Sequence, residues 1–169
     1  VVKNISDKPR SFFDNLNKWA IDSGAKGLAY IAFEKDKTKI TGKGPIAKFF
    51  SQNALNLLVK DSNVSPNDCI FFISDKYSEA IKFAGLVRTK IGTDLKLIDE
   101  DQFNFCWIVD FPMYQYDEVE KKLDFSHNPF SMPQVNIDEF DKMDPLKVLA
   151  YQYDLVCNGY EISSGAIRN

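Results

Sequence analysis

The residues best suited to chemistry lie in the last third of the chain. His127 is the only histidine, and it stands between a predicted strand and a turn that Asn128-Pro129 fixes. No second histidine, no nearby cysteine and no Gly-x-Ser-x-Gly motif accompanies it. The sequence therefore argues against a Ser-His-Asp hydrolase and against a zinc site. A lone histidine is more often a surface or hydrogen-bonded residue than a catalytic one.

Glu161 and Arg168 form a second pair of candidates. They stand seven positions apart, an odd number, so a regular strand would place them on opposite faces. A β-bulge would bring both onto one face, and Ser164-Gly165 is the expected place for it. The carboxylate would then hold a metal ion and the guanidinium an anionic ligand. The alternative is a hairpin edge with two solvated charges, and the residues alone leave it open.

The remaining candidates have simpler structural explanations. Asp110, in Asp110-Phe111-Pro112-Met113, is expected at the solvated end of a strand that the proline stops. The segment 41–45 lacks the Gly-x-x-x-x-Gly-Lys-Ser/Thr spacing of a phosphate-binding loop and predicts a turn. Three cysteines without a Cys-x-x-Cys spacing indicate buried, reduced thiols in a cytosolic protein. They are Cys69, Cys106 and Cys157.

Composition places the chain among ordinary globular proteins. Its 169 residues are 44% hydrophobic and 27% charged, which excludes a disordered tail, a collagen and a coiled coil. The net charge of −3 does not support a broadly basic surface for nucleic acid. No apolar run approaches the roughly 20 residues of a membrane span. The chain begins with Val1-Val2-Lys3-Asn4, and we expect an internal fragment of a longer protein.

The first 98 residues alternate predicted helices and strands. Asp7 and Pro9 open a helix that ends before Gly24. Ser51 is expected to cap a second helix, and Gly92 to stop a third. The second and third helices are expected at 51–60 and 75–91, and strands at 28–33, 38–42 and 69–73. This order predicts an α+β domain over residues 1–98.

The second part of the chain, 103–169, reads as antiparallel sheet. Apolar and polar residues alternate over 103–110 and again over 150–157. Further strands are expected near 123–126 and at 160–168, and a loop or short helix at 136–144. The acidic segment 98–102 marks the boundary between the two parts. Polar groups on one face of such a sheet either meet solvent or line a site.

Three sequence blocks carry a family resemblance. They are Trp107-Ile108-Val109-Asp110-Phe111-Pro112-Met113, His127-Asn128-Pro129-Phe130, and Asn158-Gly159-Tyr160-Glu161 with Arg168 seven residues on. In this order and at this spacing they resemble the bacterial aspartyl-tRNA synthetases, which are class II enzymes. The resemblance implies that residues 103–169 are part of the antiparallel class II catalytic domain.

The first half resembles the insertion domain of the same family, which is related to a domain of the B subunit of the tRNA-dependent amidotransferase. The matching residues are Gly24-Ala25-Lys26-Gly27-Leu28-Ala29 and Lys43-Gly44-Pro45-Ile46-Ala47-Lys48-Phe49. The alternative function is therefore a non-enzymatic module that contacts tRNA or another partner. The blocks of the second half argue against that alternative, since a binding module would not need them.

The resemblance implies an aspartate–tRNA ligase, which activates aspartate with ATP and magnesium and transfers it to tRNA. Glu161 is implied to contact ATP through Mg²⁺, Arg168 to grip the aspartate side chain, and His127 to contact bound aspartate. No residue of the chain is implied to be catalytic. The parent enzyme is expected to be a cytoplasmic homodimer without a membrane segment. The sequence does not tell whether it charges only the aspartate tRNA or also the asparagine tRNA.

The chain departs from the family pattern at two places and lacks several family motifs. The family often has two adjacent histidines where this chain has His127-Asn128, and a Gly-Gly-Gly-Ser run where it has Ser163-Ser164-Gly165-Ala166. A contact from that family serine is lost at Ala166. The dimerisation motif, the motif with the ATP-binding arginine, the final arginine motif and the anticodon-binding barrel are absent, so we expect this chain alone to be inactive.

Overall fold

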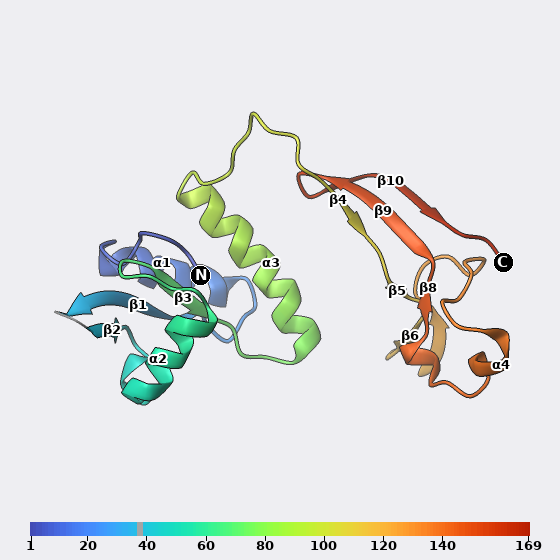
Figure 1. The fold of residues 1–169 in the computed structure, drawn as a ribbon, viewed down its shortest axis with the longest axis horizontal. Helices are drawn as coiled ribbons and strands as arrows, with labels where there is room; N and C mark the ends of the chain where they lie inside the picture. Colours follow the sequence, from blue (N-terminus) through green and yellow to red (C-terminus); the bar gives the residue numbers. More distant parts are fainter. Residues whose placement is uncertain (37–38) are drawn as a thin grey trace. The chain divides into compact units, whose positions relative to one another are not determined.

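The computed structural model describes residues 1–36 and 39–169, which divide into two compact units, 1–98 and 99–169. The first unit contains three helices of 13, 10 and 18 residues, whereas the second consists mainly of short strands (Figure 1). All paired strands are antiparallel. The α+β class predicted from the sequence is therefore confirmed.

Unit 1 is a small antiparallel sheet with helices on both faces. Its strands, in the order β2-β1-β3, are β1 (Ala29–Asp36), β2 (Lys39–Lys43) and β3 (Cys69–Phe72). Its helices are α1 (Arg10–Asp22), α2 (Gln52–Asp61), α3 (Tyr77–Asp94) and the 3₁₀ turn η1 (Ala47–Phe49). Phe13 of α1 packs against Tyr30 and Ala32 of β1, whereas α2 packs against Ile31 and Phe33. Because side chains alternate along a strand, α1 and α2 cover opposite faces of the sheet.

Most predicted elements of this unit are confirmed, but the predicted end of one helix is wrong. Ser51 caps α2 by accepting a hydrogen bond from the amide of Ala54 at 3.2 Å. The predicted strand 38–42 corresponds to β2, and Thr38 lies outside the described residues. Helix α3 does not stop at Gly92 but continues to Asp94. A Cβ at Gly92 would come within 3.2 Å of the Ile98 side chain, so this glycine allows close packing instead of ending the helix.

Unit 2 contains three separate antiparallel sheets. Its strands are β4 (Phe105–Ile108), β5 (Phe111–Pro112), β6 (Tyr114–Asp117), β7 (Lys122–Phe125), β8 (Leu149–Ala150), β9 (Gln152–Cys157) and β10 (Tyr160–Ala166). The sheets are β10-β9-β4, β5-β8 and β6-β7. Short helices α4 (Ile137–Phe140) and η2 (Pro145–Lys147) join them. The small core consists of Met113, Val148 and Ala150, so little apolar area is buried in this unit.

The burial of the three cysteines differs from the prediction. Cys69 is buried, and burial raises the pKa of its thiol to about 12. Cys106 is exposed and Cys157 is half-buried, so the prediction of three buried thiols is wrong. The reason is that β4, which carries Cys106, is exposed along its whole length. All three thiols are free of disulfide bonds.

We propose that residues 1–98 fold as a domain of their own. Three core clusters hold this unit together, and every residue in them comes from within it. The N-terminal segment is also fixed inside the unit, because Val2 pairs with Cys69. A chain of residues 1–98 should therefore unfold in one cooperative transition, and a gradual loss of helical signal would contradict the proposal.

Asp68 ties the N-terminal segment to the loop before β3, and its replacement is expected to destabilise unit 1. Its buried carboxylate accepts hydrogen bonds from the Lys3 ammonium at 2.8 Å, the Asn4 amide at 3.1 Å and the Ser65 amide at 2.8 Å. Burial raises the pKa of Asp68, but these contacts lower it by more, so the pKa lies below its ordinary value. Asp68→Asn should lower the free energy of unfolding by about 1–3 kcal/mol.

Urea unfolding of residues 1–98 measures this effect. A carboxyl whose pKa is depressed on folding stabilises the native state above its unfolded pKa, near 4, and this stabilisation is lost as the pH falls through the folded pKa. The difference between the parent and Asp68→Asn should therefore be largest near neutral pH and shrink in acid. Asp7→Asn, at an exposed position, is the control and should change stability by less than about 0.5 kcal/mol. Equal stability of parent and Asp68→Asn at pH 7 would contradict the role of Asp68.

Candidate functional site

The sheet β10-β9-β4 carries the candidate site. Its register pairs Glu161 with Val156, Ser164 with Asp154 and Ala166 with Gln152. Directly paired residues of antiparallel strands lie on the same face. Cys106 and Ile108 of β4 pair with Val156 and Asp154 and complete that face. We call it the polar face; its residues are Cys106, Ile108, Gln152, Asp154, Val156, Glu161, Ser164 and Ala166.

A β-bulge decides where Glu161 points. Glu161 pairs with Val156, but Ser163 already pairs with the next residue, Leu155, so Ile162 is the extra residue. The extra residue shifts the alternation by one position and puts Glu161 on the polar face. The prediction that a bulge is needed is confirmed, whereas its predicted place at Ser164-Gly165 is wrong.

Gly165 has a different role from the one expected. It pairs regularly with Tyr153, and a Cβ at this glycine would come within 2.6 Å of the Tyr153 ring. Glycine is therefore needed because the ring lies directly over the strand on the face opposite the polar face. The sequence showed a glycine suited to a bulge, but the tyrosine packed over it depends on the strand register.

Arg168 follows the end of β10 and continues the alternation of Ser164 and Ala166, which places it on the polar face. It forms an antiparallel bridge with Ser131, and its guanidinium carbon lies 3.7 Å from the centre of the Phe130 ring. Its side chain is exposed, and no carboxylate of residues 1–36 and 39–169 forms an ion pair with it. The guanidinium is thus available to an anionic ligand.

Glu161 and Arg168 share the polar face but lie at opposite ends of it. Seven positions of nearly extended chain, with one bulge, separate their Cα atoms by about 20 Å. The two side chains therefore do not contact each other as one ion pair. They can instead hold two ends of an extended ligand that lies along β10.

His127 lies beside the Arg168 end of the face. It follows β7, is exposed, and packs edge to face on Phe111 with ring centres 5.1 Å apart. The residues after it form the turn that bridges to Arg168 through Ser131. The structure thus brings two of the three predicted ligand-binding residues, His127 and Arg168, to the same end of the sheet.

Asp154 and Gln152 are two residues of this face that sequence reasoning did not single out. Asp154 adds a second carboxylate in the middle of the polar face, one strand away from Glu161. Gln152 is buried and donates hydrogen bonds to the hydroxyl of Ser131 at 2.9 Å and to the carbonyl of Asn128 at 3.3 Å. The alternation over 150–157 indicated which residues share a face, but only the pairing with β10 shows which side chains they meet.

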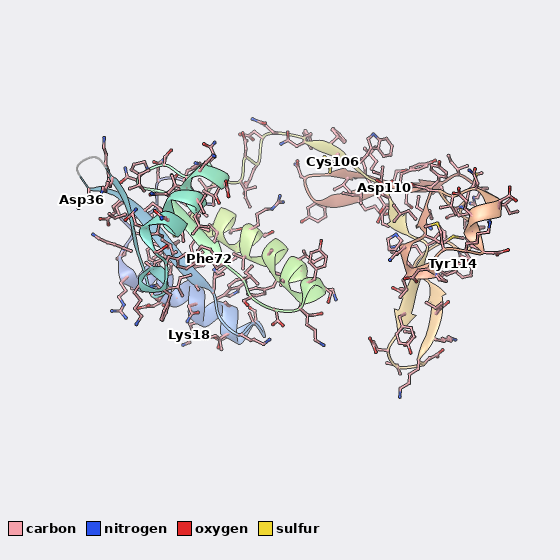
Figure 2. The ribbon with its side chains drawn as sticks, turned by 60° about the horizontal axis from the view of Figure 1, so that its bottom comes forward. Lys18, Asp36, Phe72, Cys106, Asp110 and Tyr114 are labelled. Carbon is pink, nitrogen blue, oxygen red and sulfur yellow. The ribbon has the colours of Figure 1, made fainter. Side chains whose placement is uncertain are left out.

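Asp110 does not join this face. It follows β4 with a positive φ of 59°, is exposed, and accepts a hydrogen bond from the side-chain amide of Gln134 at 3.0 Å. Figure 2 labels it just beyond Cys106, at the point where the chain leaves β4. The expectation of a solvated carboxylate beyond the end of a strand is confirmed, but the expectation that the proline stops the strand is wrong, because β4 ends at Ile108 and Pro112 lies within β5.

The donor set of the face fits magnesium. Among the residues that the structure describes, no three His, Cys, Asp or Glu side chains are grouped as a metal site. Magnesium usually needs only one or two carboxylates, the other ligands being phosphate oxygens and water. Glu161 and Asp154 provide two carboxylates on one face.

The comparison with protein families decides the family. The model for "tRNA synthetases class II (D, K and N)" matches residues 31–169. The chain belongs to this family. The resemblance carried by the three sequence blocks is thereby confirmed.

Close relatives within this class II family carry one name. An "Aspartate--tRNA(Asp/Asn) ligase" of Pelagibacter ubique is 54% identical over 169 residues, which are 100% of this chain and 28% of the relative. Proteins of the same name from Wolbachia pipientis of Culex pipiens and from Methylorubrum extorquens are 56% and 51% identical over 97% and 96% of the chain. The chain spans about 28% of the length of the curated relatives it matches.

Proposed function

We propose that the full-length protein containing this chain is an aspartate–tRNA ligase, which joins aspartate to the α-phosphate of ATP with release of pyrophosphate, forming aspartyl-adenylate, and then transfers the aspartyl group to tRNA with release of AMP. The observation that carries the proposal is the polar face, where a free guanidinium and a carboxylate stand at the two ends of one strand. The aspartate side chain and the ATP phosphates are both anionic, so the first needs a cationic side chain and the second a metal cation that a carboxylate holds. The relatives' printed name agrees with this activity.

Each end of the polar face has a distinct role in this proposal. Arg168 binds the side-chain carboxylate of aspartate through two parallel hydrogen bonds, and it rejects asparagine because an amide would present its own N–H groups to those donors. His127 contacts the bound aspartate from the same end. Glu161, with Asp154 on the neighbouring strand, would hold Mg²⁺, which would supply positive charge to the phosphates of ATP. Like charges would otherwise keep a carboxylate away from ATP.

We further propose that the protein charges both the aspartate and the asparagine tRNA. We also propose that it is a cytoplasmic homodimer that does not associate with a membrane. The tRNA range follows the name of its relatives, "Aspartate--tRNA(Asp/Asn) ligase". No helix among residues 1–36 and 39–169 is long and apolar enough to cross a membrane. Charging of separate transcripts of the two tRNAs tests the range, and acylation of the aspartate tRNA alone would contradict it.

Aspartate-dependent exchange of pyrophosphate into ATP tests the activity itself. The full-length protein should catalyse it with aspartate and not with asparagine. Residues 1–169 alone should not, because the positive groups that stabilise charge on the α-phosphate belong to family motifs outside this chain. No exchange by the full-length protein would contradict the proposed function and favour a non-enzymatic binding module.

A further inference from the structure

A proline turn brings an aromatic ring under Arg168. The carbonyl of Asn128 accepts a hydrogen bond from the amide of Ser131 at 3.2 Å, which closes a β-turn with Pro129 in its second position. The third residue of the turn is Phe130, and the Arg168 guanidinium carbon lies 3.7 Å from the centre of its ring. The closed turn and the fixed φ of its proline restrict the backbone that carries Phe130.

The backbone holds the turn and Arg168 in register. Two hydrogen bonds flank Arg168: Met132 donates to the carbonyl of Ile167 at 2.8 Å, and Asn169 donates to the carbonyl of Phe130 at 3.2 Å. They form the antiparallel bridge between Ser131 and Arg168. The ring and the guanidinium therefore belong to two segments that this bridge joins, because Phe130 directly precedes Ser131.

Gln152 fixes the same turn from the neighbouring strand. Its side-chain amide donates to the carbonyl of Asn128 and to the hydroxyl of Ser131, the first and last residues of the turn. Gln152 and Ser131 are 6% and 0% exposed. Buried polar groups are costly unless they are hydrogen-bonded, so this pair holds the turn in one arrangement.

The stacked contact has a consequence for ligand binding. All five guanidinium N–H groups point outward in the plane of the group. A ring against one face of the plane leaves those donors free and restricts the rotation of the group. Such a contact favours a carboxylate that approaches in the plane, with both oxygens bound at once.

We propose that Phe130 and Gln152 are positioning residues for Arg168: Phe130 supports the guanidinium, and Gln152 fixes the turn that carries Phe130. This inference rests on the proposed function, because it takes the aspartate carboxylate as the ligand of Arg168. Neither residue touches the reacting atoms. Their loss should therefore weaken aspartate binding and leave the chemical step and ATP binding unchanged.

The test is steady-state pyrophosphate exchange by the full-length protein, with aspartate and ATP varied in turn. Phe130→Leu should raise the aspartate KM about three- to tenfold, with kcat and the ATP KM within about twofold. Gln152→Leu should change the same parameter in the same direction, and Phe130→Tyr, which keeps the ring, should resemble the parent. The control is Phe125→Leu, which removes a ring that packs on Tyr114 instead of Arg168.

A double substitution separates positioning from general damage. Once Arg168→Lys has removed the planar group, Phe130→Leu should raise the aspartate KM by less than about twofold. Equal effects of Phe130→Leu in both backgrounds, or an equal loss for ATP, would overturn the inference. If Phe130→Leu does not fold, Phe130→Met replaces it with the same expectations. Exchange by the parent that is sensitive to Arg168→Lys but not to Phe130 or Gln152 changes would overturn this inference alone, whereas no exchange by the parent would overturn the proposed function.

Discussion

Replacing Arg168 with lysine is expected to raise the aspartate KM of the full-length protein by a factor on the order of 10² to 10³. A lysine ammonium is a point charge and cannot form the two parallel hydrogen bonds that the guanidinium offers to a carboxylate. We expect bound aspartate to bury this exposed guanidinium, and disrupting a buried charged pair costs about 3–5 kcal/mol. The ring of Phe130 is also shaped to support a planar group, which lysine lacks. Pyrophosphate exchange at varied aspartate measures the change.

The ATP KM should change far less, because the ATP contacts are assigned to Glu161 and to motifs outside this chain. The chain offers a matched control in Arg88, an exposed arginine of α3. Arg88→Lys makes the same chemical change away from the polar face and should leave both KM values within about twofold. An aspartate KM and kcat within twofold of the parent for Arg168→Lys would show that Arg168 is a solvated charge at a strand end.

Local sequence signals predicted unit 1 well. The capping serine of α2, the glycine after α1 and the apolar spacing of α3 all act within a few residues, so they can be recognised from the sequence. The signal that failed was also local: Gly92 resembles a helix stop, but it serves packing against Ile98. A glycine marks a need for space or for an unusual φ, and the sequence does not distinguish the two.

The pairings of unit 2 were harder to predict, because strand pairing joins residues that are far apart in the chain. Strands β5 and β8 are two residues each and carry no periodicity of their own. Their pairing depends on the core formed by Met113, Val148 and Ala150. The alternation in longer strands was visible in the sequence, but their register was not.

The candidate site was likewise predictable where local patterns determine it and not where strand pairing does. The odd number of positions between Glu161 and Arg168 established that the two side chains share a face only if the strand contains one extra residue. It did not establish which residue, and the structure places the bulge at Ile162. Gln152 and Asp154 escaped notice because a glutamine and an aspartate in an alternating strand are ordinary on a solvated face. Their importance depends on Ser131 and Glu161, which only the folded sheet brings near.

Glu161→Gln is expected to produce the opposite pattern to Arg168→Lys. The amide keeps the shape of the side chain but removes the negative charge that magnesium requires beside the phosphates. Loss of one contact to a charged group costs about 1.5–3 kcal/mol, so the ATP KM and the Mg²⁺ concentration at half-maximal rate should rise about ten- to hundredfold. The aspartate KM should change by less than about threefold, because Arg168 lies at the other end of the polar face. Exchange measured in titrations of ATP, Mg²⁺ and aspartate separates these effects.

The matched control is Glu118→Gln, an exposed glutamate between β6 and β7, which should match the parent in all three titrations. A rise in the aspartate KM without a change in the Mg²⁺ requirement would contradict the assignment of Glu161 to ATP.

Asp154→Asn tests whether both carboxylates of the polar face hold the same ion. If they do, either single change should raise the Mg²⁺ requirement. The double change should raise it by less than the product of the two single fold increases, because residues that share one ligand do not act independently.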